Sequence, residues 1–344
     1  MRADPATYGD PAGSRFVREP APRRRFWQSA GHFLLRWREV SIVAAALLLI
    51  VYFQSTANAF LSSANIGNLI DYTATTAIIA AGEVMVLVAG ELDLSVGMVY
   101  AFAPFIMFFA AAAGAPMWLA VVAALAAAAG VGVVNAAITI LLDVPAFVTT
   151  LGTLFVVNGL TLTISGGFPV QPQAGAMFTA LFGGSVWARL AWAVAIAVLL
   201  QLVLVRTRFG LHTIATGGNL TGAAEVGIKV RSIKAANFIL CAVLGGFAGV
   251  IDAFRIGSID PLAGGSDIMF AAIASAVIGG TLLTGGLGTV VGALTGALVL
   301  GILKDGFSLS GVSAYTFDMI LGGAILVTMA VNVRLMRLRD QGRG

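Results

Sequence analysis

The sequence predicts an all-α integral membrane protein, and three observations lead to this prediction. Of the 344 residues, 59% are hydrophobic and only 10% are charged, whereas a soluble domain carries about 25% charged residues. The apolar residues come in long runs. The 42 glycines suit helices that pack closely in lipid. A single water-soluble core is therefore excluded.

Ten segments are apolar enough to be transmembrane helices, since a helix needs about 20 mainly apolar residues to cross the hydrocarbon. We expect these helices at residues 41–58, 71–89, 95–113, 117–142, 146–165, 186–205, 235–253, 268–283, 286–303 and 315–333. Only Thr284 and Gly285 separate the eighth segment from the ninth. An even number of spans places both ends of the chain on one side of the membrane.

The distribution of basic residues predicts the orientation, because Lys and Arg stay on the cytoplasmic side. All but three of the 20 basic residues lie in the two terminal tails or in one loop. We therefore expect both termini to be cytoplasmic, with basic tails at residues 1–40 and 334–344, a cytoplasmic loop at 206–234 and a transmembrane domain over 41–333. The exceptions are Arg189, Arg255 and Lys304.

This basic charge predicts contact with anionic membrane lipid. A sequence pI near 9.6 is also compatible with nucleic-acid binding. However, the basic residues gather at the membrane borders, so no nucleic-acid partner is expected.

Two blocks of four spans, the second to fifth and the seventh to tenth, each follow an isolated span. An odd number of crossings separates their starts, so the second block is expected to be inverted relative to the first. Inverted repeats are common in transporters, where the pathway lies at their interface. The predicted fold is therefore two inverted helical blocks.

The loop at residues 90–97 carries two carboxylates between two apolar runs, and Glu83 lies inside the preceding run. Ionised groups at this depth are costly, so they face a protein interior or a wet pathway. Asp93 and Ser95 can cap the third span or line a translocation route, and the two roles are compatible. Glu83 is expected to be protonated or paired.

The fifth span is unusually polar for a transmembrane helix. Its hydroxyl and amide groups either bond between helices within the bundle or form a mildly polar wall for a hydroxylated solute, and the sequence leaves both open. The candidates for this wall are Phe147, Thr150, Thr153 and Asn158.

The cytoplasmic loop contains a stretch that is too polar for lipid and yet partly apolar. Asn219 or Thr221 can cap a short helix that runs through Glu225, and Gly227 can end it. Such a helix, lying flat on the cytoplasmic face, would be a docking surface for a soluble partner. The alternative is a connector that only closes the bundle.

Three further patterns point to structure rather than to chemistry. Gly288, Gly292 and Gly296 recur every four residues in the ninth span, which predicts a seam for helix packing. Asp252 and Arg255, three residues apart, can form an interfacial ion pair. No second ligand lies near His212 in the sequence, so neither a metal site nor a cofactor is expected.

Five stretches match the motifs of one family in order along residues 41–333. The first is a G-G-I-D-L-S-V-G motif at 90–97, with Glu91 in place of the second glycine. A P-x-F-x-x-T-L-G-T motif follows at 145–153, and an A-x-G-x-N-x-x-A-A-x-x-x-G-I loop at 215–228. The last two are glycine-rich stretches at 273–288 and 292–313. On these residues the chain resembles the permease subunit of ABC importers of the ribose/xylose/galactose type. Asn158 and Ala271 replace an arginine and an acidic residue that are common in this family.

The resemblance implies a permease in the bacterial inner membrane that forms the pathway for a monosaccharide or a similar polyhydroxylated solute. It also implies three protein partners: an ABC ATPase subunit, a periplasmic sugar-binding protein and a second permease, identical or related. The cytoplasmic loop would be the coupling helix for the ATPase, through Gly218, Asn219, Ala223, Ala224, Glu225 and Gly227. The sequence contains no G-x-x-x-x-G-K-[ST] phosphate loop, so ATP hydrolysis is expected on a separate chain.

Two other classes of function compete with this hypothesis. A proton-coupled secondary transporter would use Glu83 or Glu91 as its proton carrier and would need no partner. A membrane enzyme is the weaker alternative, because the sequence has neither an H-E-x-x-H zinc motif nor a nucleophile–base pattern.

Overall fold

The chain folds as a bundle of helices in the computed structural model, which describes residues 38–313, 316, 319–320, 322–323 and 326–327. The described part forms no β-sheet; its one β-bridge joins Val170 to Ile259. The all-α class is therefore confirmed. The predicted N-terminal tail up to residue 37, the whole C-terminal tail and more than half of the tenth span lie outside the described residues.

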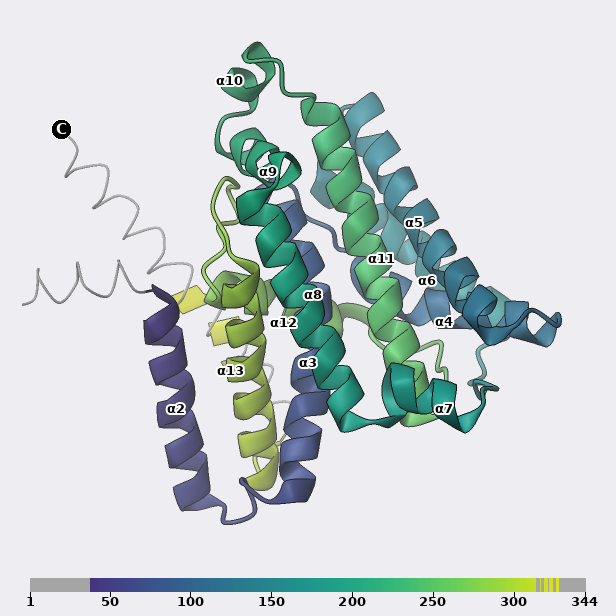
Figure 1. The fold of residues 1–344 in the computed structure, drawn as a ribbon, viewed down its shortest axis with the longest axis vertical. Coiled ribbons are helices and arrows are strands. Elements are labelled where there is room, and N and C mark those ends of the chain that lie inside the picture. Colours follow the sequence, from purple (N-terminus) through teal and green to yellow (C-terminus); the bar gives the residue numbers. More distant parts are fainter. Residues whose placement is uncertain (1–37, 314–315, 317–318, 321, 324–325, 328–344) are drawn as a thin grey trace, which may run out of the picture. The chain divides into compact units, whose positions relative to one another are not determined.

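The helices follow one another with short connections (Figure 1). Their bounds are α2 (Arg38–Thr56), α3 (Ser63–Val88), α4 (Val96–Ala112), α5 (Met117–Leu141), α6 (Ala146–Ser165), α7 (Ala176–Thr179), the π-helical turn η1 (Ala180–Gly184), α8 (Val186–Arg206), α9 (Arg208–Gly218), α10 (Leu220–Glu225), α11 (Val230–Ile256), α12 (Gly265–Ile278) and α13 (Val290–Leu309).

Six helices of the described part, α3, α5, α6, α8, α11 and α13, are long and apolar enough to cross a membrane. They correspond to the second, fourth, fifth, sixth, seventh and ninth predicted spans. The first, third and eighth predicted spans correspond to shorter apolar helices within α2, α4 and α12. The total of ten spans, the inverted relation of the two blocks and the side on which each terminus lies stay predictions.

Four predicted boundaries are wrong by five residues or more, namely the starts of α3 and α11 and the ends of α12 and α13. Helix α3 begins at Ser63, well before residue 71, because Ser62 caps it by accepting a hydrogen bond from the Asn65 amide at 3.4 Å. Helix α12 ends at Ile278 and not at residue 283, because Gly279 and Gly280 turn the chain, the latter with φ of +99°. A loop rather than a two-residue break therefore separates α12 from α13.

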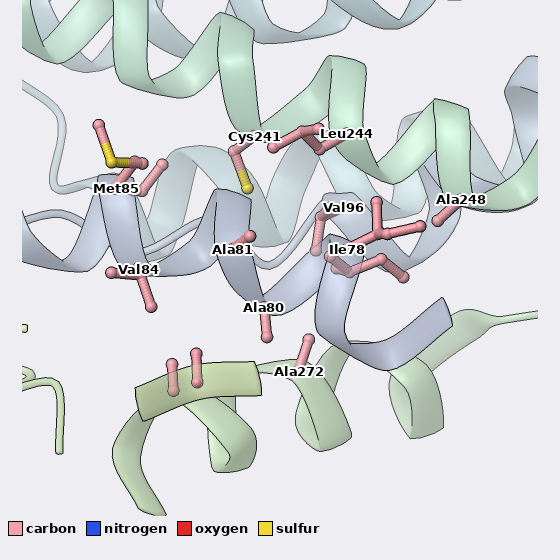
Figure 2. Packing of buried hydrophobic residues seen from close by; sticks show 14 of the residues in the cluster. Ile78, Ala80, Ala81, Val84, Met85, Val96, Cys241, Leu244, Ala248 and Ala272 are labelled. Carbon is pink, nitrogen blue, oxygen red and sulfur yellow. The ribbon is translucent and has the colours of Figure 1, made fainter. Parts of the chain in front are cut away.

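Helix α3 lies at the centre of the bundle. Every residue from position 73 to position 89 is buried, and α3 packs against α8, α11, α12 and α13. In Figure 2, Ala80 of α3 points toward Ala272 of α12, on the side of α3 away from Cys241 of α11. A helix that is buried on all sides must satisfy its polar groups within the protein.

Small residues allow the close approach of neighbouring helices. A Cβ added to Gly296 of α13 would lie 2.1 Å from the Ser275 carbonyl oxygen of α12. A Cβ added to Gly292 would lie 2.2 Å from the Gly279 carbonyl oxygen. A Cβ on Gly288 would meet Val88 and Thr281 side chains at 2.7 and 2.8 Å. Backbone contact between α13 and the end of α12 thus depends on glycine at positions 292 and 296, whereas Gly288 lies before α13 and is confined by side chains.

We predict that Gly296→Ala destabilises the protein by about 1–3 kcal/mol, because the added methyl group overpacks a backbone contact. The measurement is the thermal unfolding midpoint of the purified protein in detergent.

The matched control is Gly159→Ala in α6, where an added Cβ meets nothing within 4 Å. Alanine is the better helix former by up to about 1 kcal/mol, so this variant should be as stable as the wild type or more so. Equal midpoints for Gly296→Ala and the wild type would contradict the packing argument.

Candidate functional site

The loop between α3 and α4 holds a fully buried carboxylate. Oδ1 of Asp93 accepts hydrogen bonds from the Ser95 amide at 2.9 Å and from the Ser95 hydroxyl at 2.6 Å. The Asn135 amide of α5 donates to Ser95 Oγ at 2.8 Å and lies 3.3 Å from Asp93 Oδ1. Asp93, Ser95 and Asn135 therefore form one polar cluster at the interruption between two apolar helices.

The capping interpretation of this loop needs correction. Ser95 occupies the N-cap position of α4, but its side chain makes no capping hydrogen bond. Its hydroxyl donates instead to the Asp93 carboxylate, two residues earlier in the loop. The two residues shape the entry into α4 by bonding to each other.

Glu83 lies inside α3 and is completely buried. The Cys241 thiol of α11 donates to its Oε1 at 3.7 Å, and Oε2 has no hydrogen-bond partner in the described part of the chain. A thiol is a weak donor, so this carboxyl group is poorly paired where it lies.

The polar residues of α6 are not gathered in one place. Thr150 is buried; its hydroxyl donates to the Ala146 carbonyl oxygen of α6 at 2.8 Å and lies 3.3 Å from the Leu92 carbonyl oxygen in the Asp93 loop. Thr153 is buried and bonds only to its own helix, through the Thr149 carbonyl oxygen. Phe147 is exposed and Asn158 half-buried. Of the predicted pathway residues, the structure thus brings together Asp93, Ser95 and Thr150.

A second polar cluster lies near the other end of α3, where sequence reasoning placed only an ion pair. Asp252 Oδ1 accepts from Arg255 Nε at 2.5 Å, which confirms the predicted Asp252–Arg255 pair. Asp252 also accepts from the hydroxyls of Tyr100 in α4 and Thr75 in α3. Three helices therefore meet at one carboxylate.

Asp71 of α3 extends this cluster toward α8. Arg189 donates to its Oδ1 from Nε at 2.8 Å, and Arg255 Nη1 lies 3.8 Å from its Oδ2. The third basic exception, Lys304, lies over the Tyr72 ring, 4.4 Å from its centroid. The three basic residues outside the predicted cytoplasmic segments thus all have partners at this end of α3.

Two cavities meet at Asp252. The first, of about 240 Å³, is lined by Asn68, Asp71, Tyr72, Thr75, Thr76, Asp252, Arg255 and Ile268. The second, of about 180 Å³, lies against α4 and the loop after α11, and its lining includes Tyr100, Asp252 and Asp260. None of the seven predicted pathway residues lines either cavity.

Sequence reasoning missed Asp71 and Tyr100 as members of this site. One signal could have found Asp71, since it is a carboxylate inside an apolar run, like Glu83. The predicted span began at residue 71, which placed this side chain at the membrane border instead of inside a helix.

The opposite end of the bundle carries the helix pair α9–α10 (Figure 1). Asn219 caps α10 by accepting a hydrogen bond from the Gly222 amide at 2.9 Å. It is one of the two residues that the sequence predicted as the cap. Gly227, with φ of +86°, follows the helix. Helix α9 was not predicted; Thr207 caps it by accepting from the Gly210 amide at 3.2 Å.

Helix α10 has one face on the bundle and one face outward. Ala223 is buried, whereas Ala224 is exposed, so the structure separates two residues that the motif treats alike. Leu220 and Val226 are exposed apolar residues, Val226 at 77% of its surface. The remaining residues of the predicted coupling stretch, Gly218, Asn219, Glu225 and Gly227, are exposed.

The end of α9 touches the loop that carries Asp93. A Cβ on Gly217 would lie 2.0 Å from the Val88 carbonyl oxygen and 2.8 Å from the Gly286 amide nitrogen. The Gly286 amide donates to that same Val88 oxygen at 2.9 Å. In addition, Lys234 of α11 pairs with Glu91 in the loop. Backbones from three parts of the chain therefore meet at the end of α3.

Comparison with known proteins identifies the family of this fold. Residues 65–329 match the family described as branched-chain amino acid transport system / permease component. The chain belongs to this family. The match covers both polar clusters and the α9–α10 pair of the permease.

The relatives of the permease are import permeases. It is 36% identical over 304 residues to the xylose/arabinose import permease of Sulfolobus acidocaldarius, covering 86% of this chain and 84% of that protein. It is 34% identical over 316 residues to the ribose import permease of Escherichia coli K12, covering 88% and 95%, and 28% identical over 311 residues to the D-allose transport system permease of that strain, covering 89% and 92%. No solved structure matches.

These similarities establish the broad role of the chain. It is a multi-pass membrane permease component and not itself an enzyme, and the ATPase of such an importer is a separate subunit. The hypothesis of a proton-coupled secondary transporter is not favoured.

We predict that Ser95→Ala lowers the free energy of unfolding of the permease by about 1–3 kcal/mol, since it removes the buried hydroxyl that donates to Asp93 and accepts from Asn135. Unfolding in detergent, followed by tryptophan fluorescence, measures this loss. The control is Ser55→Ala, because the exposed Ser55 hydroxyl bonds only to its own helix, and its loss should cost less than about 0.5 kcal/mol. Similar losses in the two variants would show that the Asp93 cluster does not stabilise the loop.

Proposed function

We propose that this chain is the permease subunit of an ATP-driven, binding-protein-dependent importer, and that it forms the pathway for a monosaccharide or a similar polyhydroxylated solute. The observation that carries the proposal is similarity over nearly the whole chain to permeases for xylose/arabinose and for ribose. The exposed face of α10 supports it, because a passive pathway needs a surface through which an ATPase can act.

The proposed partners follow from this role. An ABC ATPase binds the cytoplasmic face at α10, a periplasmic sugar-binding protein delivers the solute to the opposite face, and a second copy of the permease or a related chain completes the pathway. The proposed location is the bacterial inner membrane, with both termini in the cytoplasm.

The proposed coupling route runs from α10 into the core. A force on α10 reaches the end of α9, where Gly217 lies against the Val88 carbonyl oxygen and the Gly286 amide. Val88 ends α3, and the Asp93 loop follows it directly. A movement at the ATPase would therefore change the interruption between α3 and α4.

The pathway residues have two different roles in this proposal. Asp93, Ser95 and Thr150 hold the interrupted segment, and the fully buried Glu83 lies beside it. Phe147, Thr153 and Asn158 contribute to the wall of α6. In the present conformation the Asp93 cluster is enclosed, which is the arrangement expected of a closed gate.

We predict that the double variant Ala224→Glu/Val226→Asp abolishes ATP-driven uptake, with a reduction of roughly tenfold or more, because charge in a desolvated contact weakens binding by several kcal/mol. Both side chains are exposed, so insertion into the membrane should be unchanged. Solute uptake by cells and retention of the ATPase during purification measure the effect.

Leu262→Asp is the control for ATPase retention, because Leu262 is an exposed apolar residue in the loop after α11, at the other end of that helix from α10. It should retain the ATPase at wild-type level. Normal uptake by the Ala224→Glu/Val226→Asp variant would refute the coupling role of α10.

A second prediction separates this function from proton-coupled transport. In an ATP-driven importer, Glu83→Gln should change the uptake rate by no more than about twofold, since no proton is carried. The buried amide keeps the size of the side chain and carries no charge. Initial uptake rates at equal expression decide the matter, and complete loss of transport with normal membrane insertion would favour the proton-carrier hypothesis.

A further inference from the structure

The first cavity has the lining of a small-molecule site, and its volume lies somewhat below the usual range of about 300–1,000 Å³. Its volume of about 240 Å³ corresponds to about eight water molecules at roughly 30 Å³ each. Its walls come from the first half of α3, the last turns of α11 and the start of α12. Ligand sites between helices combine apolar walls with a few placed polar groups, and here Tyr72 and Ile268 lie beside amide, hydroxyl and charged groups.

The charged groups of the described residues at this cavity are all engaged with partners. Asp71 is paired with Arg189, Asp252 is paired with Arg255, and Lys304 lies over the Tyr72 ring. None of these groups is left over as the counter-charge for an anion or a cation. An uncharged solute is therefore the favoured occupant.

The paired charged groups at the cavity still have unused hydrogen-bonding capacity. Within the described residues, the Arg255 guanidinium donates a hydrogen bond only through Nε, to Asp252. Its Nη1 lies 3.8 Å from Asp71 Oδ2, which is close enough for an ion pair but too far for a hydrogen bond. A hydroxyl group can accept from a guanidinium nitrogen and donate to a carboxylate at once, so it fits between these two side chains.

Neutral polar groups continue this pattern along the cavity wall. Asn68 offers both donors and an acceptor, and the Thr76 hydroxyl offers one donor and two acceptors. Neither residue belongs to the ion-pair cluster. The Tyr72 ring, with Lys304 over it, supplies apolar surface for the C–H groups of a ring. Alternating hydroxyl and C–H groups are the chemistry of a sugar.

We propose that this cavity is a subsite of the permease for an uncharged polyhydroxylated molecule the size of a monosaccharide, and that Asn68, Thr76, Asp71 and Arg255 select it by its hydroxyl groups. The proposal rests on the proposed function and deepens it. The cavity lies near the end of α11 away from α9–α10, so it is placed to receive solute before the Asp93 loop does. The permease then adds its own selectivity to that of a delivery protein.

The direct test is saturation-transfer NMR on the purified full-length permease with D-xylose, L-arabinose and D-ribose in turn. This method detects weak binding, and only groups in contact with the protein receive magnetisation. At least one sugar should show transfer in the wild type, an excess of a pentitol should abolish it, and a sugar phosphate at the same concentration should not. Thr76→Val and Asn68→Ala should weaken the apparent affinity by about 2- to 10-fold each, as expected for loss of a neutral hydrogen bond.

Thr163→Val is the matched control, because the exposed Thr163 hydroxyl bonds only to its own helix, at the Gly159 carbonyl oxygen. It should bind like the wild type. No transfer from any of the three sugars, equal transfer in Thr76→Val, Asn68→Ala and wild type, or displacement by the sugar phosphate would each overturn the subsite.

A parallel uptake assay keeps this proposal distinct from the proposed function. Failure of the intact wild-type importer to take up any sugar with ATP would overturn the proposed function. ATP-driven uptake with unchanged sugar preference in Thr76→Val and Asn68→Ala would leave that function standing and overturn the subsite alone.

Discussion

The structure depends on one constraint: a helix buried on all sides must satisfy its own polar groups and those at its ends inside the protein. Helix α3 is buried in this way from residue 73 on. Polar groups in it and next to it gather at two places, the Asp252 cluster and the Asp93 cluster just beyond its end, whereas Thr73 Oγ1 and Glu83 Oε2 have no hydrogen-bond partner in the described part of the chain. The neighbouring helices are held in position by these bonds and by close backbone contacts at glycines. Charged groups inside the bundle therefore specify which helices meet, although ion pairs of this kind are weak evidence of added stability.

We propose that the two clusters have different roles in the pathway. The Asp252 cluster surrounds open space and presents unused hydrogen-bonding groups to it. The Asp93 cluster is enclosed and lies against the backbone of α9 and of the loop before α13. In the proposed function, a solute meets the cavity at one end of α3, whereas the part that an ATPase would move lies at the other. Glu83 of α3 and Cys241 of α11 are buried next to the Asp93 cluster.

Hydropathy predicted the six long helices because a membrane span needs little more than length and apolar content. The cap of α10 was predictable because an asparagine before a helix has a local chemical role. Two features were beyond local reasoning. The polar residues Asn65, Asn68 and Asp71 hid the first turns of α3, since a carboxylate at a border looks the same in sequence as one paired with Arg189 from another helix. The burial of Ala223 and the exposure of Ala224 depend on how α10 lies on the bundle, and a sequence motif carries no information about that orientation.

The central claim is that transport through this permease is driven by ATP on a partner subunit. The most direct measurement is uptake of labelled pentoses and hexoses into liposomes that contain the permease with the proteins that co-purify from its native membrane. The account predicts that uptake requires ATP and a sugar-binding protein, and that it persists after the proton gradient is collapsed. Uptake by the permease alone, driven by a proton gradient without ATP, would contradict it.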